Sequence, residues 1–448
     1  MTSLPLLTGS ADRRRAFALL LVLFAIAIVT LVLVSLQASA FRQAAMGREA
    51  VARTRAHWAA RAGLEATIAR LAYNVENANT GNAFTIEDDM RDVASGNLER
   101  ATWEIRHEFD ERESWGPLDP HAKVNINRMT RDDLMELPLM TEDVADAILD
   151  WIDEDDVPNE FGIETGFYEQ LPSPYTPRNA PIRNLLEIEL VYGVDPFDLR
   201  GEDWNLNNRL DPNEDDGDLT FPPDNADGVL DAGWSGYITA QSVDESMAVS
   251  GEARLSVPES TADQLVARIP SLNQAQADII VQFSQQENVR PIDLLAQPLT
   301  QIAQSFAQPG QPPSPQLTDL TIDQVETILD ELTFHLPDDP PTPGRVNLNT
   351  CSRETLDYVT SIQPGVADFL ILERNARATG FAHILDLLDV PGITESGLVE
   401  LSRYLDVQSN AWVVISRGRD EATGIEVEIV ATIERSTLPI VITEYVVR

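Results

Sequence analysis

The chain has 448 residues, a formal net charge of -41, one cysteine and one lysine. Its length exceeds one ordinary hydrophobic core, so we expect two or three subdomains. Residues 1–80 hold nine Arg against four acids, so the remainder is more acidic still; its charge repels nucleic acid and anionic lipid and suits cations or basic partners. Cys351 cannot form an internal disulfide, and Lys123 lies in no phosphate-loop motif.

The first element in the chain is an apolar run of 21 residues, Ala16 to Leu36, preceded by Arg13, Arg14 and Arg15. As a helix it spans a hydrocarbon layer of roughly 30 Å, whereas the apolar core of a cleaved secretory signal has about 7 to 15 residues. We therefore expect one retained span in the inner membrane. The positive-inside bias predicts a cytoplasmic N-terminus and a periplasmic bulk.

The helix is expected to continue out of the membrane, over 17–73, because Met46 to Tyr73 has no Pro and is rich in Ala, Arg and Leu. Leu64, Ile68 and Leu71 form a stripe that predicts packing on a sheet. Gly47 and Gly63 are possible bends.

Strand patterns occur at two places that lie far apart in the sequence. Ala101 to Phe109 alternates apolar and polar residues, and strands return only within 411–448. We predict that these segments pair, with 74–122 as the first part of the sheet and 123–410 as a mainly helical insertion. The expected fold class is therefore α+β: a long helix on a small antiparallel sheet, with a large α-helical insertion.

The insertion contains three repeats that resemble helix-hairpin-helix units, near 123–153, 254–297 and 345–407. The first and third open with Asn-x-Asn-x-x-Thr/Ser, at Asn125 and Asn347, a pattern typical of helix caps, and the second is a looser copy. The hairpins lack the paired glycines that present backbone amides to phosphate, and no basic patch lies beside them. We therefore expect a packing scaffold and no nucleic-acid binding.

The segment 201–236 holds ten acids and one base, and its spacing predicts calcium loops. A calcium loop needs oxygen ligands at positions 1, 3, 5, 9 and 12, with a backbone carbonyl at position 7 and a turn at position 6. Asn208 stands at position 6, where Asn tolerates positive φ. The six ligand positions are filled by Asp203, Asn205, Asn207, Arg209, Asp211 and Glu214.

A second, weaker calcium loop follows, with Asn225, Asp227 and Asp231 at positions 3, 5 and 9. Pro223 and Trp234 stand at positions 1 and 12, so this copy lacks the bidentate carboxylate. It is a loose site, a site that borrows Asp224 or a distant acid, or a plain turn.

The N-terminal boundary resembles the signal of type IV pilins and type II secretion pseudopilins, in which a prepilin peptidase cuts before Phe17. The residue before that cut is normally Gly, whereas this chain has Ala16, and Leu21 replaces the Glu of major pilins. The absence of that Glu and the segment DWIDEDD, residues 150–156, resemble the minor pseudopilin K family. The resemblance implies a leader at 1–16, a pilin-like sheet at 74–122 and 411–448, and calcium in the inserted domain. A plain N-terminal anchor is the alternative.

The combined pattern predicts a structural minor pseudopilin at the tip of the type II secretion pseudopilus. Its expected partners are other minor pseudopilins and the inner-membrane platform of the secretion system. The alternatives are a membrane-anchored helix-hairpin-helix DNA receptor and a calcium-dependent surface adhesion module. No enzyme is expected, because the histidines show no zinc spacing and lie near no nucleophile motif; they are His57, His107, His121, His335 and His383.

Overall fold

The computed structural model describes residues 10–77, 81–109, 112–244, 247–306 and 316–448, and side chains from residue 17 onward. The predicted leader at 1–16 therefore lies largely outside the described residues. Ala16 lies within the first helix, but its side chain is not among those described.

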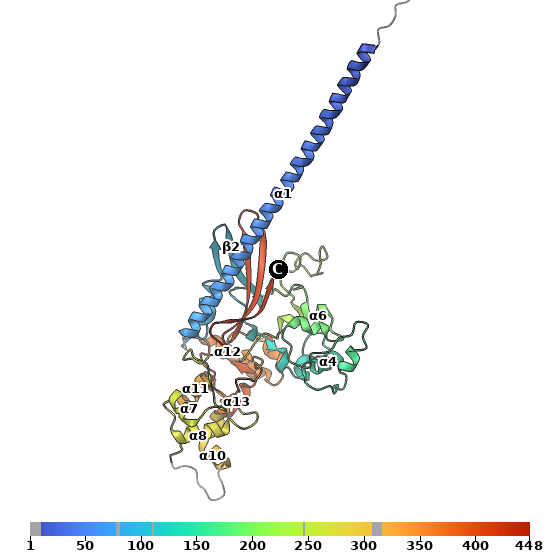
Figure 1. The fold of residues 1–448 in the computed structure, drawn as a ribbon. Coiled ribbons are helices and arrows are strands. Elements are labelled where there is room, and N and C mark those ends of the chain that lie inside the picture. Colours follow the sequence, from blue (N-terminus) through green and yellow to red (C-terminus); the bar gives the residue numbers. More distant parts are fainter. Residues whose placement is uncertain (1–9, 78–80, 110–111, 245–246, 307–315) are drawn as a thin grey trace, which may run out of the picture.

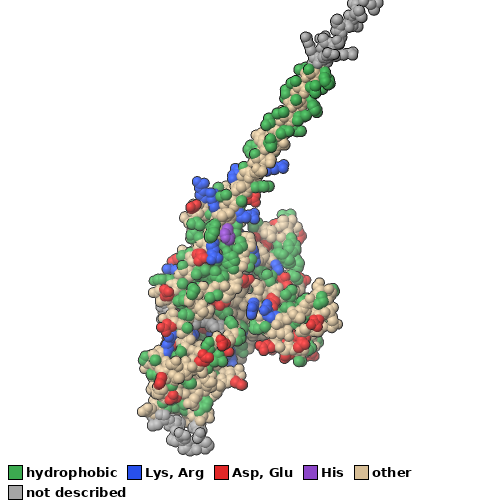
Figure 2. Space-filling model, viewed as in Figure 1, with side chains coloured by type: hydrophobic (Ala, Val, Ile, Leu, Met, Phe, Trp, Pro, Cys, Tyr) green, Lys and Arg blue, Asp and Glu red, His purple; other side chains and the backbone are tan. Residues whose placement is uncertain are grey.

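Helix α1, Ser10–Glu76, is one continuous helix of 67 residues. Its first part stands clear of the rest of the molecule, and apolar side chains cover it before arginines appear nearer the body (Figures 1 and 2). Its most apolar stretch has a mean hydropathy of 3.3 and is fully exposed. By length and composition this helix is able to cross a membrane.

The sheet joins strands from both ends of the chain in the order β1-β2-β10-β11-β12, and β3 also pairs with β2. β2 is antiparallel to β10, with Ser416 opposite Ile105. This confirms the predicted pairing and the α+β fold class. The bounds of the strands are β1 Ser95–Leu98, β2 Ala101–Phe109, β3 Arg112–Trp115, β10 Ala411–Asp420, β11 Glu426–Glu434 and β12 Val441–Val447.

The C-terminal half of α1 packs on one face of this sheet (Figure 1). Leu64 and Leu71 are fully buried there with Ile105, and Ile68 packs against them, as the apolar stripe predicted. Two glycines allow the close approach. A Cβ on Gly418 of β10 would lie 1.9 Å from the Ala56 carbonyl oxygen, and one on Gly63 would lie 2.5 Å from Ser416 Oγ. Gly63 is thus a contact point, and the prediction of a bend there is wrong, because α1 runs through it without a break.

The insertion leaves the sheet after η1, Pro120–Ala122, and returns at Ala411, where β10 begins. Arg55 of α1 contacts Asp420 at the other end of β10, 3.5 Å apart. Since α1 runs from the apolar segment through Arg55 toward Glu76, the Asp420 end of the sheet is nearer the apolar segment. The insertion therefore extends from the far end.

Short helices, 3-10 turns and two-residue strands make up the insertion, around two separate apolar cores. Its α-helices, with α2 (Thr85–Arg91) before it, are α3 Arg131–Met135, α4 Glu142–Ile152, α5 Thr165–Tyr168, α6 Pro196–Arg200, α7 Ala262–Arg268, α8 Gln274–Phe283, α9 Asp293–Ala296, α10 Leu299–Phe306, α11 Ile322–Glu331, α12 Pro364–Ala376 and α13 Glu395–Leu401. Its 3-10 turns are η2 Ile126–Arg128, η3 Leu185–Leu190, η4 Gly233–Gly236, η5 Glu354–Tyr358 and η6 Ile384–Asp389. Three parallel pairs of two-residue strands link its segments: β4 Val124–Asn125 with β5 Ile238–Thr239, β6 Leu255–Ser256 with β7 Leu332–Thr333, and β8 Val346–Asn347 with β9 Leu405–Asp406.

The Asn-x-Asn openings do more than cap helices. Asn125 caps only η2, and Thr130 caps α3 through a capping box with Asp133. The second Asn of the motif instead bonds to the backbone of a segment much later in the sequence. Asn127 exchanges two hydrogen bonds with the backbone of Ile182. Asn349 does the same with Phe381 in the third repeat. The motif thus links segments that lie about 30 to 55 residues apart in the sequence by hydrogen bonds. Its predicted role as a helix cap is only partly right.

Candidate functional site

The predicted calcium loop at 203–214 is a compact turn in which backbone amides point at carboxylates. Asp203 Oδ1 and Oδ2 accept from the backbone N–H groups of Asn207 and Asn208, at 2.9 and 2.8 Å. Glu214, at position 12, accepts from the N–H groups of Trp204 and Asp211. Asn208 has φ of 49°, so position 6 has the left-handed conformation that the sequence predicted. The structure therefore brings positions 1 and 12 into one buried turn.

Burial makes this loop electrostatically unfavourable without a compensating charge. Asp203 and Glu214 are almost completely buried. Burial raises the pKa of Asp203 to about 6 and, with the negative charge of Asp203 nearby, that of Glu214 to about 8. Lys123 partly compensates, because its positive charge acts on Asp203 while its Nζ donates to Asn208 Oδ1 and the Ser235 carbonyl. A divalent cation would favour the ionised form of both carboxylates.

The side chains of positions 3, 5 and 9 also face one another. Asn205 Nδ2 and Asn207 Nδ2 each donate to Asp211 Oδ2 at 3.0 Å. An Asn side chain presents an oxygen at the same place after rotation of its amide, so both can act as ligands. The residues present fit an oxygen-liganded cation.

The same loop is fixed to the sheet face opposite α1. Arg209, at position 7, pairs with Glu104 of β2 at 3.0 Å. The Leu210 N–H donates to Glu108 Oε1, and Arg417 of β10 pairs with Asp211 at 2.9 Å. The loop therefore joins the insertion to this face of the sheet, along the length of β2 and at Arg417 of β10.

The second loop has the same backbone geometry as the first. Position 4 has positive φ in both, Leu206 at 52° and Ala226 at 54°, and Gly228 at position 6 has φ of 78°. Asn225 Nδ2 donates to Asp231 Oδ2 at 3.0 Å, as Asn205 does to Asp211 in the first loop. Of the three readings left open from the sequence, this repeat geometry argues against a plain turn of unrelated shape.

Two acids from outside the second loop occupy the places of its missing carboxylates. Glu202 accepts from the N–H groups of Asn225 and Asp231, at positions 3 and 9, whereas Glu214 accepts from positions 2 and 9 of the first loop. Asp215 accepts from the Gly228 N–H, as Asp203 does from Asn208. Sequence reasoning missed both, because they precede the loop they complete.

A third acidic group was also missed. Asp150, Asp153 and Glu164 place carboxylate oxygens within 4.8 Å of one another. Asp150 is fully buried at the end of α4, and Glu164 immediately precedes α5. A Cβ on Gly162 would lie 1.9 Å from Asp150 Oδ2, so only glycine leaves room for this oxygen.

Most oxygens of these three carboxylates lack a hydrogen-bond donor. Asp150 Oδ1 accepts from Asn159, but Asp150 Oδ2, Asp153 Oδ1 and both oxygens of Glu164 are buried without a hydrogen-bond partner. Burial, together with the charge of Asp150, raises the pKa of Glu164 to about 7. Unpaired buried carboxylates are costly, and a hard cation supplies what they lack. The other acids of this run, Glu154, Asp155 and Asp156, are exposed.

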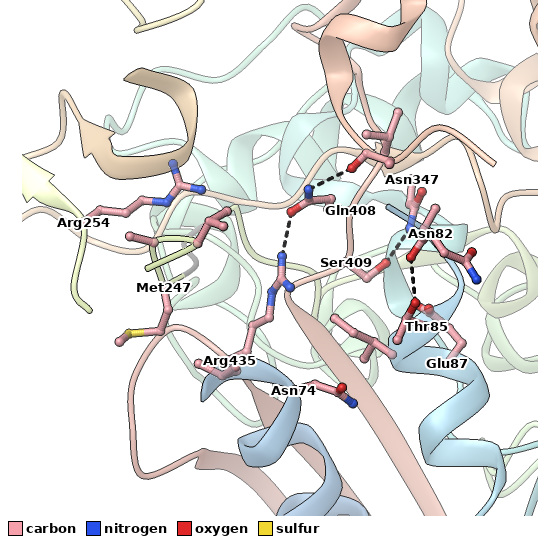
Figure 3. Close-up of a pocket in the computed structure, with 17 residues that line it drawn as sticks. Asn74, Asn82, Thr85, Glu87, Met247, Arg254, Asn347, Gln408, Ser409 and Arg435 are labelled. Atoms are coloured by element: carbon pink, nitrogen blue, oxygen red, sulfur yellow. Dashed lines mark hydrogen bonds between the residues drawn. The ribbon is translucent and has the colours of Figure 1, made fainter. Parts of the chain in front are cut away.

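A polar cavity of about 90 Å³ lies where the end of α1, helix α2 and the insertion meet. Arg435 donates to Gln408 Oε1 on one side, and Asn74 and Glu87 line the other (Figure 3). Burial and the charge of Asp119 raise the pKa of Glu87 to about 7. The volume accommodates a few water molecules and is smaller than ordinary ligand pockets. We assign it to the junction and not to ligand binding.

These features define a class: a protein whose long N-terminal helix, able by length and composition to cross a membrane, packs on an antiparallel sheet into which an α-helical domain is inserted. Residues 122–200 match the family model for protein K of the type II secretion system. Residues 343–406 match the helix-hairpin-helix motif, as predicted for the third repeat. Residues 122–200 are thus similar to a domain of protein K, which supports the resemblance stated from the sequence.

Two known proteins illustrate the similarity. The type II secretion system protein K of Pectobacterium carotovorum subsp. carotovorum is 33% identical over 72 residues, which are 16% of this chain and 22% of that protein. The chain thus matches about a fifth of the length of this relative. Among solved structures, a chain of the GspK-GspI-GspJ complex from the type 2 secretion system of enterotoxigenic Escherichia coli aligns over 91% of this chain and 99% of its own. Its sequence identity is 12% and its TM-score 0.42.

Proposed function

We propose that this chain is a minor pseudopilin that stands at the tip of a type II secretion pseudopilus and supports the export of folded proteins. The single observation that carries the proposal is the placement of the insertion. It extends from the end of the sheet remote from the apolar part of α1 (Figure 1). A domain of this size at that end would collide with a subunit stacked above, whereas nothing stands above a tip subunit.

In this role α1 anchors the chain in the inner membrane with its N-terminus in the cytoplasm, and the bulk lies in the periplasm. A prepilin peptidase cuts between Ala16 and Phe17. Other minor pseudopilins pack along α1, and the inner-membrane platform of the secretion system receives the chain before assembly. The role is structural and involves no catalysis.

N-terminal sequencing of the membrane-extracted protein tests this proposal. A mature chain that begins at Phe17 is the expected result. A chain that keeps residues 1–16 while the secretion system is active would contradict processing as a pseudopilin and favour a plain anchor.

We further propose that calcium binds the insertion. The support is the pair of loops with equal geometry, one centred on Asp203 and Glu214 and one completed by Glu202 and Asp215. The partnerless oxygens of Asp150 and Glu164 support an additional centre. Calcium would supply positive charge to these carboxylates, and the first loop would then stabilise the contact between insertion and sheet.

A further inference from the structure

An exposed cluster of aromatic side chains lies beside the calcium loops. Phe197, Trp204 and Phe221 stack in a triangle, with ring centroids 4.7 to 6.1 Å apart. Phe221 is 55% exposed, Phe197 is 44% exposed, and the neighbouring Leu219 is 84% exposed. We call these four residues the aromatic loop surface. Contiguous exposed apolar groups of this kind mark protein contacts, whereas scattered single ones do not.

The rim of this surface is acidic. Asp195 and Asp218, neither of which belongs to the candidate calcium loops, have exposed positions in the same segment. The nearby Arg200 does not neutralise the acidic rim, because it pairs with Glu189. Its guanidinium carbon also lies 4.9 Å from the ring centroid of Trp204, on which it stacks. A partner that brings Lys or Arg among aliphatic side chains would satisfy both features, since a cation pairs with carboxylates and stacks on aromatic rings.

The location of the aromatic loop surface limits which kind of partner can reach it. Arg448, after the last residue of β12, donates to Asn205 in the loop that contains Trp204. Val447 pairs with Ile429, which lies opposite Ser416, three residues along β10 from the Arg419–Glu426 pair. The loop that contains Trp204 therefore contacts the half of the sheet nearer the apolar part of α1, next to the C-terminus (Figure 1).

The bilayer itself is out of reach. From Leu36 to Arg55 the helix rises about 28 Å at 1.5 Å per residue. Along this bare stretch Phe41, Met46 and Val51 are 64%, 67% and 50% exposed. The space between the bilayer and the sheet accommodates another protein domain beside the helix, and the acidic rim disfavours anionic lipid.

We propose that the aromatic loop surface is the site at which the next subunit toward the membrane docks, through a patch of aliphatic side chains that carries Lys or Arg. This inference rests on the proposed function, because it takes the partner to be another minor pseudopilin. Beyond the proposed function, the inference identifies the surface of this chain that binds the partner and the side chains that the partner contributes. The partner covers Leu219 and Phe221, and its cations meet the acidic rim.

The test uses the full chain, purified in detergent and titrated with each minor pseudopilin of the same secretion system. Leu219→Asp is expected to weaken binding at least tenfold, and Asp218→Arg is expected to weaken it and to reduce its dependence on salt. Val157→Asp is the matched control, because Val157 is 70% exposed in the same domain but lies outside the surface. Equal melting temperatures of all variants show that the changes act on binding and not on folding.

Each result supports or overturns the inference. Unchanged binding of both Leu219→Asp and Asp218→Arg, with a complex still formed, overturns the docking surface and leaves the proposed function standing. If the unaltered chain binds no minor pseudopilin, the proposed function fails and the inference with it. Loss of vesicle binding or of self-association in Leu219→Asp, without an effect on pseudopilin binding, would show a lipid or a second copy as the occupant and overturn it too.

Discussion

Asp211 Oδ1 of the inserted domain lies 2.9 Å from Arg417 Nη2 of strand β10. The same Nη2 lies 3.0 Å from Glu428 Oε2 of β11, so one guanidinium joins a predicted calcium ligand to the sheet. All three side chains are mostly buried. The orientation of the insertion relative to the sheet thus depends on an ion-pair network and not on apolar packing alone.

Arg417→Ala is therefore expected to lower the free energy of unfolding by about 3 kcal/mol, because it leaves buried Asp211 without its cation and leaves Glu428 only the more distant Arg448, 3.9 Å away. Arg403→Ala is the matched control: its pair with Glu400 is exposed, so the expected loss is under about 1 kcal/mol. Urea unfolding of both variants in the same detergent measures the difference. Equal small losses would mean that the network does not hold the domains together.

Gly418→Ala tests the close contact between α1 and the sheet. The new methyl group would meet the Ala56 carbonyl oxygen and the Ala60 nitrogen, so helix and strand must separate, at a cost of about 1 to 3 kcal/mol. Gly365→Ala in α12 meets nothing within 4 Å and is expected to be neutral or slightly stabilising. Thermal unfolding compares the two, and a neutral Gly418→Ala would show that the helix does not pack as closely as described.

Calcium is expected to raise the melting temperature of the unaltered chain, since a ligand that binds only the folded state stabilises it. Asp203→Ala combined with Glu214→Ala should lower the melting temperature in calcium and leave it nearly unchanged in chelator. Asp338→Asn, an exposed acid outside the candidate sites, serves as the control. Identical melting of the double variant and the unaltered chain in calcium would remove the first loop as a site.

The carboxylates at 150, 153 and 164 predict a pH dependence. The folded state raises the pKa of Glu164 from its ordinary value near 4.5 to about 7, so it binds a proton that the unfolded chain has released. In chelator, stability should therefore fall as pH rises from about 4.5 to about 7 and then level off. Glu164→Gln should flatten this slope, and so should calcium, whereas the exposed Glu154→Gln should not. A slope unaffected by Glu164→Gln would contradict the assignment.

Sequence periodicity predicted the elements whose apolar residues recur regularly. The stripe at Leu64, Ile68 and Leu71 and the alternation in Ala101–Phe109 are local signals, and the packing of α1 and the pairing of β2 with β10 followed from them. The turn that brings Asp203 and Glu214 together also followed from the sequence, because oxygen-bearing side chains recur there at a fixed spacing. These features depend on short-range patterns that a single sequence contains.

The other parts of the fold and of the candidate sites depend on contacts between residues that no regular spacing in the sequence indicates. Asp150 and Glu164 are separated by an irregular turn, and only the close approach of Gly162 brings them together. Glu202 and Asp215 complete the second loop from positions that precede it. The two-residue parallel strands, such as Val124–Asn125 with Ile238–Thr239, are too short for any periodicity to reveal.

The central claim is that this chain occupies the end of a fibre. Immunogold labelling of an epitope placed in the insertion, on pseudopili sheared from cells that secrete, measures this directly. The account predicts one label at one end of each fibre, because a subunit that carries this domain has no room for another above it. Labels spaced along the shaft would contradict it.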